Sequence, residues 1–121
     1  MEWIYTPTEP VKVETKNHLG MPRRTVNYAI ETLDEPDESG CHYRHKAVTL
    51  DPGVWNYDAI VSALVKAEYP DDRMQAISNN FLRTLIETEI PTDKREEYLA
   101  EMQEMQDWRA TAKAIAKEIL E

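Results

Sequence analysis

The sequence predicts an α+β fold in which an N-terminal antiparallel β-sheet of three or four strands precedes three helices, the last of them long. Two observations predict this class. Apolar residues alternate with polar ones in the first half of the chain, which is the period of a strand, and recur every three or four residues in the second half, which is the period of a helix. The stretch "DPGVWN" (residues 51–56) separates the two patterns, because Pro52 and Gly53 end the extended run.

A β-hairpin of residues 24–33 and 41–50 is the most regular feature of the first half. In "RTVNYAIETL" (24–33), Val26 and Tyr28 share one face of a strand. The following "DEPDESG" (34–40) consists mostly of turn-forming residues, and "CHYRHKAVTL" then returns to an extended pattern. A lone hairpin is marginally stable in water, so we expect further strands beside it.

Two shorter stretches near the N-terminus supply those strands. They are "EWIYT" (residues 2–6) and "VKVET" (11–15), where Val11 and Val13 alternate with charged residues. We expect "NHLGMP" (17–22) to be a loop between the second of these strands and the hairpin.

The first two helices follow the Pro-Gly break. Asn56 is a favourable N-cap for a helix that ends before Pro70, and two aspartates then open the second helix at its positive end. The predicted stripe of the first helix is Tyr57, Ile60, Val61, Leu64 and Val65. The predicted stripe of the second is Met74, Ile77, Phe81, Leu82 and Leu85.

A third helix follows "IPT" (residues 90–92) and runs toward the C-terminus. Asp93 and Glu96 have the spacing of a capping box at its start. Some 25 to 28 residues at the helical rise would extend roughly 40 Å, which exceeds the core of a domain this size. We therefore expect the helix to overhang the rest of the domain.

The chain has the length and composition of one domain, with a β-rich part at 1–53 and a helical part at 54–121. Its 41% hydrophobic and 31% charged residues are typical of a globular protein. The longest apolar run, at 59–65, falls far short of the ~20 residues that cross a bilayer. Because the N-terminal residues also lack the pattern of a secretory signal and Cys41 is the single cysteine, we expect a cytoplasmic protein.

The formal net charge of −9 is concentrated in the helical half. Residues 51–121 carry 8 basic and 15 acidic side chains, whereas residues 1–50 carry 6 and 8. Binding to duplex nucleic acid draws on a basic patch that releases phosphate counterions, and the sequence has no basic run. We therefore expect neither nucleic acid nor membrane as a partner, and we interpret the acidity as a means of keeping an assembling protein in solution.

Cys41, His42 and His45 are the residues that most invite a chemical interpretation. On a strand, Cys41 and His45 point to one face and His42 to the other, so the local geometry supplies at most two convergent metal ligands. The chain has no glycine-rich phosphate loop and no catalytic motif. We expect no enzyme activity and no cofactor, and keep as the alternative a small-ligand or metal-binding domain, or enzyme, with a site near 41–45.

The third helix carries the strongest positional pattern. Four residues recur every seven positions, others fall between them, and acidic residues at the front of the helix give way to basic ones at the back. The face could pack on its own domain, or it could bind a protein partner or a second copy in antiparallel pairing. The candidate interaction residues are Tyr98, Met102, Met105, Trp108, Arg109, Ala112, Ile115 and Ile119.

Two segments carry a resemblance to a known group. "AVTLDPGVWNYDAIVSALVKAEYPDDRMQAISNN" (47–80) and "MQEMQDWRATAKAIA" (102–116) resemble small uncharacterised proteins of prophages and phage-like elements in Bacteroides-type bacteria. The second segment is also similar to the C-terminal helix of phage tail-fibre assembly proteins. The resemblance implies a non-enzymatic assembly protein or minor structural component, in the cytoplasm of the host cell or on the virion.

Overall fold

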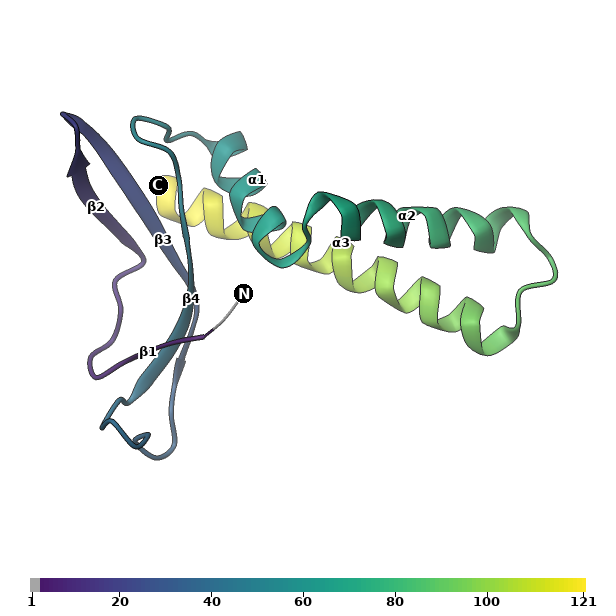
Figure 1. Ribbon diagram of the computed structural model, residues 1–121, viewed down its shortest axis with the longest axis horizontal. Coiled ribbons are helices and arrows are strands. Elements are labelled where there is room, and N and C mark those ends of the chain that lie inside the picture. Colours follow the sequence, from purple (N-terminus) through teal and green to yellow (C-terminus); the bar gives the residue numbers. More distant parts are fainter. Residues whose placement is uncertain (1–2) are drawn as a thin grey trace.

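The computed structural model describes residues 3–121 and places a β-sheet before three helices (Figure 1). The α+β prediction, with its N-terminal antiparallel sheet and long last helix, is confirmed. Within residues 3–121, no helix has the length and apolar character needed to cross a membrane. The elements are β1 (Ile4–Thr6), β2 (Val13–His18), β3 (Met21–Thr32), β4 (Tyr43–Thr49), α1 (Tyr57–Glu68), α2 (Asp71–Ile86) and α3 (Thr92–Leu120).

The predicted hairpin forms the centre of the sheet, whose strand order is β1-β4-β3-β2 with every pair antiparallel. Val26 of β3 lies opposite Val48 of β4, so two apolar side chains meet on the face that the helices cover. A bulge between Tyr28 and Glu31 shifts the register, and Ala29 there has a φ of 53°. The predicted pairing of residues 24–33 with residues 41–50 is confirmed.

The prediction that residues 17–22 form a loop is wrong. His18 pairs directly with Met21, so β2 and β3 are joined by a two-residue turn of Leu19 and Gly20. Both turn residues have positive φ, 51° and 83°, which matches the twist of a tight hairpin. Leucine seldom adopts a positive φ, so the residue types at 19 and 20 did not predict this turn.

Strands β1 and β2 lie at opposite edges of the sheet, so the segment between them crosses from one edge to the other. Figure 1 shows this connection on the side of the sheet away from the helices. The buried Asn27 fixes the end of this connection next to β2. The side-chain amide of Asn27 donates to the carbonyl oxygen of Val11 at 2.7 Å, and its backbone N–H donates to the carbonyl oxygen of Lys12 at 2.9 Å.

The main core lies between the sheet, α1 and the C-terminal part of α3. Asn56 caps α1 as predicted, accepting a hydrogen bond from the Ala59 backbone N–H at 2.9 Å. Small alanines on α3 allow the helix to approach the sheet and α1 closely. The buried residues of this core are Val26, Tyr28, Leu50, Ile60, Leu64, Val65, Ala112 and Ala116.

Helix α2 and the first part of α3 lie side by side and project away from the sheet (Figure 1). We call residues 75–104 the arm, and the sheet, α1 and residues 108–120 of α3 the body. The 29-residue α3 therefore overhangs, as its length predicted. The predicted capping box is wrong: Pro91 occupies the N-cap position of α3, and no side chain caps the helix.

Candidate interaction surface

Most of the α3 residues predicted to bind a partner pack within this chain. Met105 and Ala112 are 2% and 0% exposed. Ile115 and Ile119 pack against the main core, and Met102 packs against a smaller cluster at the base of the arm. The heptad-like spacing therefore reports a face of α3 that is covered by the sheet, α1 and α2 of the same chain.

Trp108 joins the body to the base of the arm. Its ring lies 5.5 Å from that of Tyr28, centroid to centroid, at an interplanar angle of 41°. Its indole N–H donates to the Leu64 carbonyl oxygen at 3.0 Å. A half-buried tryptophan with its one polar group satisfied inside the chain is a packing residue, so this ring offers little to a partner.

Only two of the predicted residues lie outside these packed positions. Arg109 is exposed on α3 and lines a groove beside α1. Tyr98 is half-buried in the arm, where the Arg83 guanidinium lies over its ring at 5.9 Å.

Polar contacts hold the distal end of the arm together. The Arg95 guanidinium donates to the carbonyl oxygens of Thr84 and Glu87, the latter at 2.9 Å. These carbonyls lie at the C-terminal end of α2, where helix carbonyls lack intrahelical partners and attract a cation. One arginine of α3 thus fixes the end of α2, a role that no pattern in the sequence indicated.

The outer face of α2 carries an exposed apolar stripe, which we define as Leu82, Leu85 and Ile86. These side chains are 50%, 67% and 76% exposed. Their spacing of three and four puts them on adjoining rows of the helix. Large exposed apolar side chains that gather on a projecting helix make a candidate interaction surface.

The sequence predicts one apolar face on α2, and that predicted face combines residues from two different surfaces of the helix. Leu82 and Leu85 were assigned to the same face as Ile77 and Phe81, but the structure turns only the latter pair toward the interior of the arm. The apolar arc of α2 is wider than one contact with α3 can cover. That excess width, extended by Ile86, is the observation that points to a second surface.

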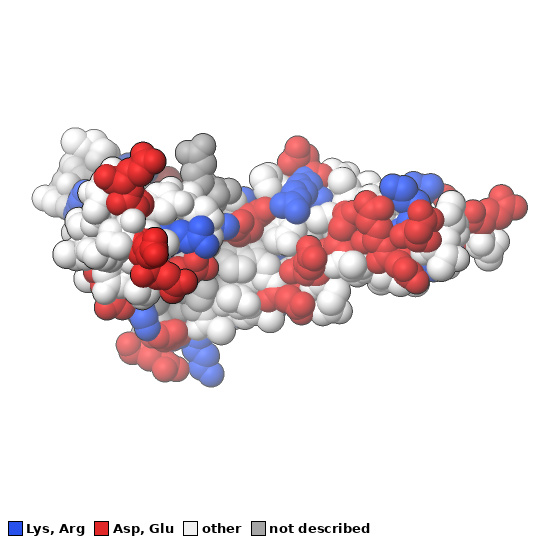
Figure 2. Space-filling model, turned by 90° about the horizontal axis from the view of Figure 1, so that it is seen from below, with Lys and Arg blue, Asp and Glu red and all other residues white. Residues whose placement is uncertain are grey.

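The arm is also acidic. Residues 75–104 contain three basic and seven acidic side chains. Figure 2 shows acidic side chains gathered on the arm beside a few basic ones. The arm therefore combines an exposed apolar stripe on α2 with a net negative charge, and like charges oppose non-specific association.

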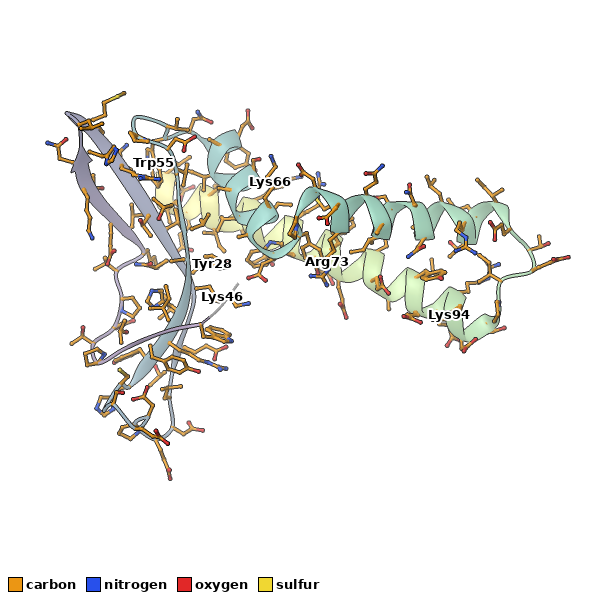
Figure 3. The ribbon with its side chains drawn as sticks, in the orientation of Figure 1. Tyr28, Lys46, Trp55, Lys66, Arg73 and Lys94 are labelled. Carbon is orange, nitrogen blue, oxygen red and sulfur yellow. The ribbon has the colours of Figure 1, made fainter. Side chains whose placement is uncertain are left out.

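A groove of about 300 Å³ lies at the waist, where α1, the start of α2 and α3 meet. Val61, Val65 and Met74 contribute apolar lining, and Lys66, Arg109 and Lys113 contribute three cations. Figure 3 shows Lys66 on α1 near its junction with α2. We call this the waist groove.

The alternative site near 41–45 gains no ligand set from the fold. Within residues 3–121, no group of three or more His, Cys, Asp or Glu side chains is placed to hold a metal ion. His45 is 5% exposed, and its Nδ1 has no hydrogen-bond partner, so burial lowers the pKa of the imidazole despite the opposing charge of Glu14. His42 is exposed, and Cys41 is half-buried in the loop before β4.

In comparisons with known proteins, the chain matches no family model, no curated protein and no solved structure.

Proposed function

We propose that this chain is a non-enzymatic interaction protein that docks on a protein partner through its arm. The observation that carries the proposal is the exposed stripe of Leu82, Leu85 and Ile86 on a helix that projects from the body. A globular chain gains stability by burying such side chains, each worth about 1.5–3 kcal/mol, and this fold leaves all three outside the core.

The arrangement of the body and the arm supports the proposed docking role. The body has a continuous core that includes the C-terminal part of α3, and the arm projects from it. The arm adds apolar surface without adding to that core. Its buried residues on α2 are Ile77, which packs with Tyr69 and Met105 at the base of the arm, and Thr84. A projecting two-helix element on a packed base is suited to contacting another protein.

We further propose that the setting is phage or prophage assembly in the cytoplasm of a host bacterium, either as an assembly factor or as a minor structural component. This part rests on the resemblance of residues 47–80 and 102–116 to prophage proteins. The acidic arm and the proposed docking role suit a protein that joins others during assembly.

Site-specific photocrosslinking tests the docking role. A photoreactive amino acid at position 86 should give a discrete crosslinked product when the protein is made in a bacterium that carries the proposed prophage. The same group at position 76, which is exposed on another side of α2, is the matched control. Products that are equally strong at both positions, or absent at position 86, would contradict the proposal.

A further inference from the structure

We infer that the partner of the arm is a second copy of this chain, whose waist groove receives the stripe, so that copies join head to tail. This inference rests on the proposed function, because it uses the same docking element. It adds the identity of the partner and the receiving site.

The waist groove has the shape and lining to receive aliphatic side chains. Its volume of about 300 Å³ is that of a small ligand pocket, and its lining includes Val61, Val65 and Met74. The groove is a hollow at the meeting point of three helices, whereas the side chains of the stripe are exposed on a projecting helix. Leu85 and Ile86, the two most exposed side chains of the stripe, are of a size to enter it.

The cations of the waist groove have no carboxylate partner in the described chain. The ion pairs within residues 3–121 involve Lys12, Arg44, Lys46, Arg83 and Lys94. Lys66, Arg109 and Lys113 take part in none of them, and Asp58 is the one carboxylate that lines the groove. In a protein of net charge −9, three unpaired cations around an apolar floor form a local attraction for an acidic, apolar ligand.

The end of the arm supplies that ligand chemistry. Glu87 and Glu89 follow the stripe directly, and Asp93 and Glu96 begin α3. Glu87 pairs with Arg83 at 3.3 Å, but Glu89, Asp93 and Glu96 enter no ion pair within residues 3–121. The arm thus presents aliphatic side chains followed by free carboxylates, complementary to the groove in both respects.

The same charges argue against symmetric pairing of like surfaces. Two arms placed together would set acidic residues against acidic ones, and two grooves would set cations against cations. The arm also cannot fill its own groove, because its tip lies at the far end of the molecule from α1 (Figure 1). The contact that remains joins the arm of one copy to the groove of the next, and such a heterologous contact builds rings or filaments.

Light scattering over a concentration series tests the inference. The wild-type mass should rise above that of one chain with increasing concentration and fall again with added salt, which screens the charges. Ile86→Glu should disable the arm and Lys113→Glu the groove, each weakening association about tenfold or more. Lys16→Glu, an equal charge change at an exposed position of β2 outside the groove, is the matched control and should associate like the wild type.

Mixing the two disabled variants gives the sharpest test. Ile86→Glu keeps a working groove and Lys113→Glu keeps a working arm, so the equimolar mixture should form complexes of two chains and no larger. Circular dichroism of each variant establishes that it is folded. A wild type that stays monomeric at every concentration, or a mixture that stays monomeric, would overturn the inference.

The crosslink at position 86 separates this inference from the proposed function. A product with the mass of two chains supports both. A product that contains only a different protein overturns self-association and upholds docking through the arm. The absence of any product at position 86 overturns both.

Discussion

The body and the arm share helix α3, yet they use it differently. In the body, α3 presents buried alanines to the sheet and α1, and the contact belongs to a core that includes Val26, Ile60 and Leu64. In the arm, the same helix packs beside α2, and their contacts include a small cluster at the base, the Arg83–Tyr98 pair and the Arg95 hydrogen bonds at the far end. Helix α3 is therefore part of the main core over its C-terminal half, and over its N-terminal half it supports α2.

This difference separates stability from the display of surface. Apolar side chains of the body are removed from water, whereas Leu85 and Ile86 of the arm remain exposed. Substitutions of similar chemistry should thus have unlike consequences in the two regions, since the cost of losing a side chain depends on how much of it was buried.

Leu64→Ala should have the largest effect on stability. Leu64 is fully buried in the main core, and its replacement leaves a cavity between α1 and α3. We expect a loss of about 2–5 kcal/mol in the free energy of unfolding, measured by urea denaturation. Leu85→Ala removes the same atoms from the arm and should change that free energy by less than about 0.5 kcal/mol. Equal losses in the two variants would contradict the distinction between body and arm.

Arg95→Ala should loosen the arm while leaving the body intact. The substitution removes the donor to the Thr84 and Glu87 carbonyl oxygens, so the end of α2 loses its cap. We expect a loss of about 1 kcal/mol and faster hydrogen exchange confined to residues 83–99. Lys94→Ala, which breaks only an exposed ion pair with Glu97, is the control and should leave exchange in that region unchanged. Exchange that quickens equally in β3 and β4 would show that the arm and body unfold together.

The central strands and α1 could be predicted from local pattern because each has buried residues on one face. The alternation in residues 24–33 and 41–50 identified β3 and β4, and Asn56 marked the start of α1. The order of the strands could not be predicted in the same way. It depends on the connection between β1 and β2 and on the bond from Asn27 to Val11, and neither leaves a periodic signal.

The candidate surface was harder to predict than the fold because hydrophobic spacing does not say what covers a side chain. The spacing of Met105 and Ala112 correctly indicated a packed face, but the packing is within the chain. Ile86 lay outside the predicted stripe of α2 and is the most exposed of the stripe residues. Whether an apolar position faces the core or a partner is decided by the long-range arrangement of α2, α3 and the sheet.

The smallest predicted effect is a change in the free energy of unfolding with pH. It should arise in the body, because the arm contains no histidine. Burial lowers the pKa of His45 in the folded protein below its ordinary value of 6.5. The unfolded chain therefore binds a proton at this position at a higher pH than the folded chain does. The free energy of unfolding should fall as the pH drops below 6.5, until the lowered pKa of the folded state is reached.

Urea denaturation at pH 7, 6 and 5 measures this contribution. His45→Phe removes the titrating group and its unpaired nitrogen, so its stability should fall less than that of the wild type over this range. His42→Gln removes an exposed histidine and should follow the wild type. Hydrogen exchange at pH 5 should show the loss in β4 and its neighbours while the arm is unaffected beyond the intrinsic change in rate. A His45→Phe profile parallel to that of the wild type would mean that carboxylates, and not this imidazole, set the acid sensitivity of the body.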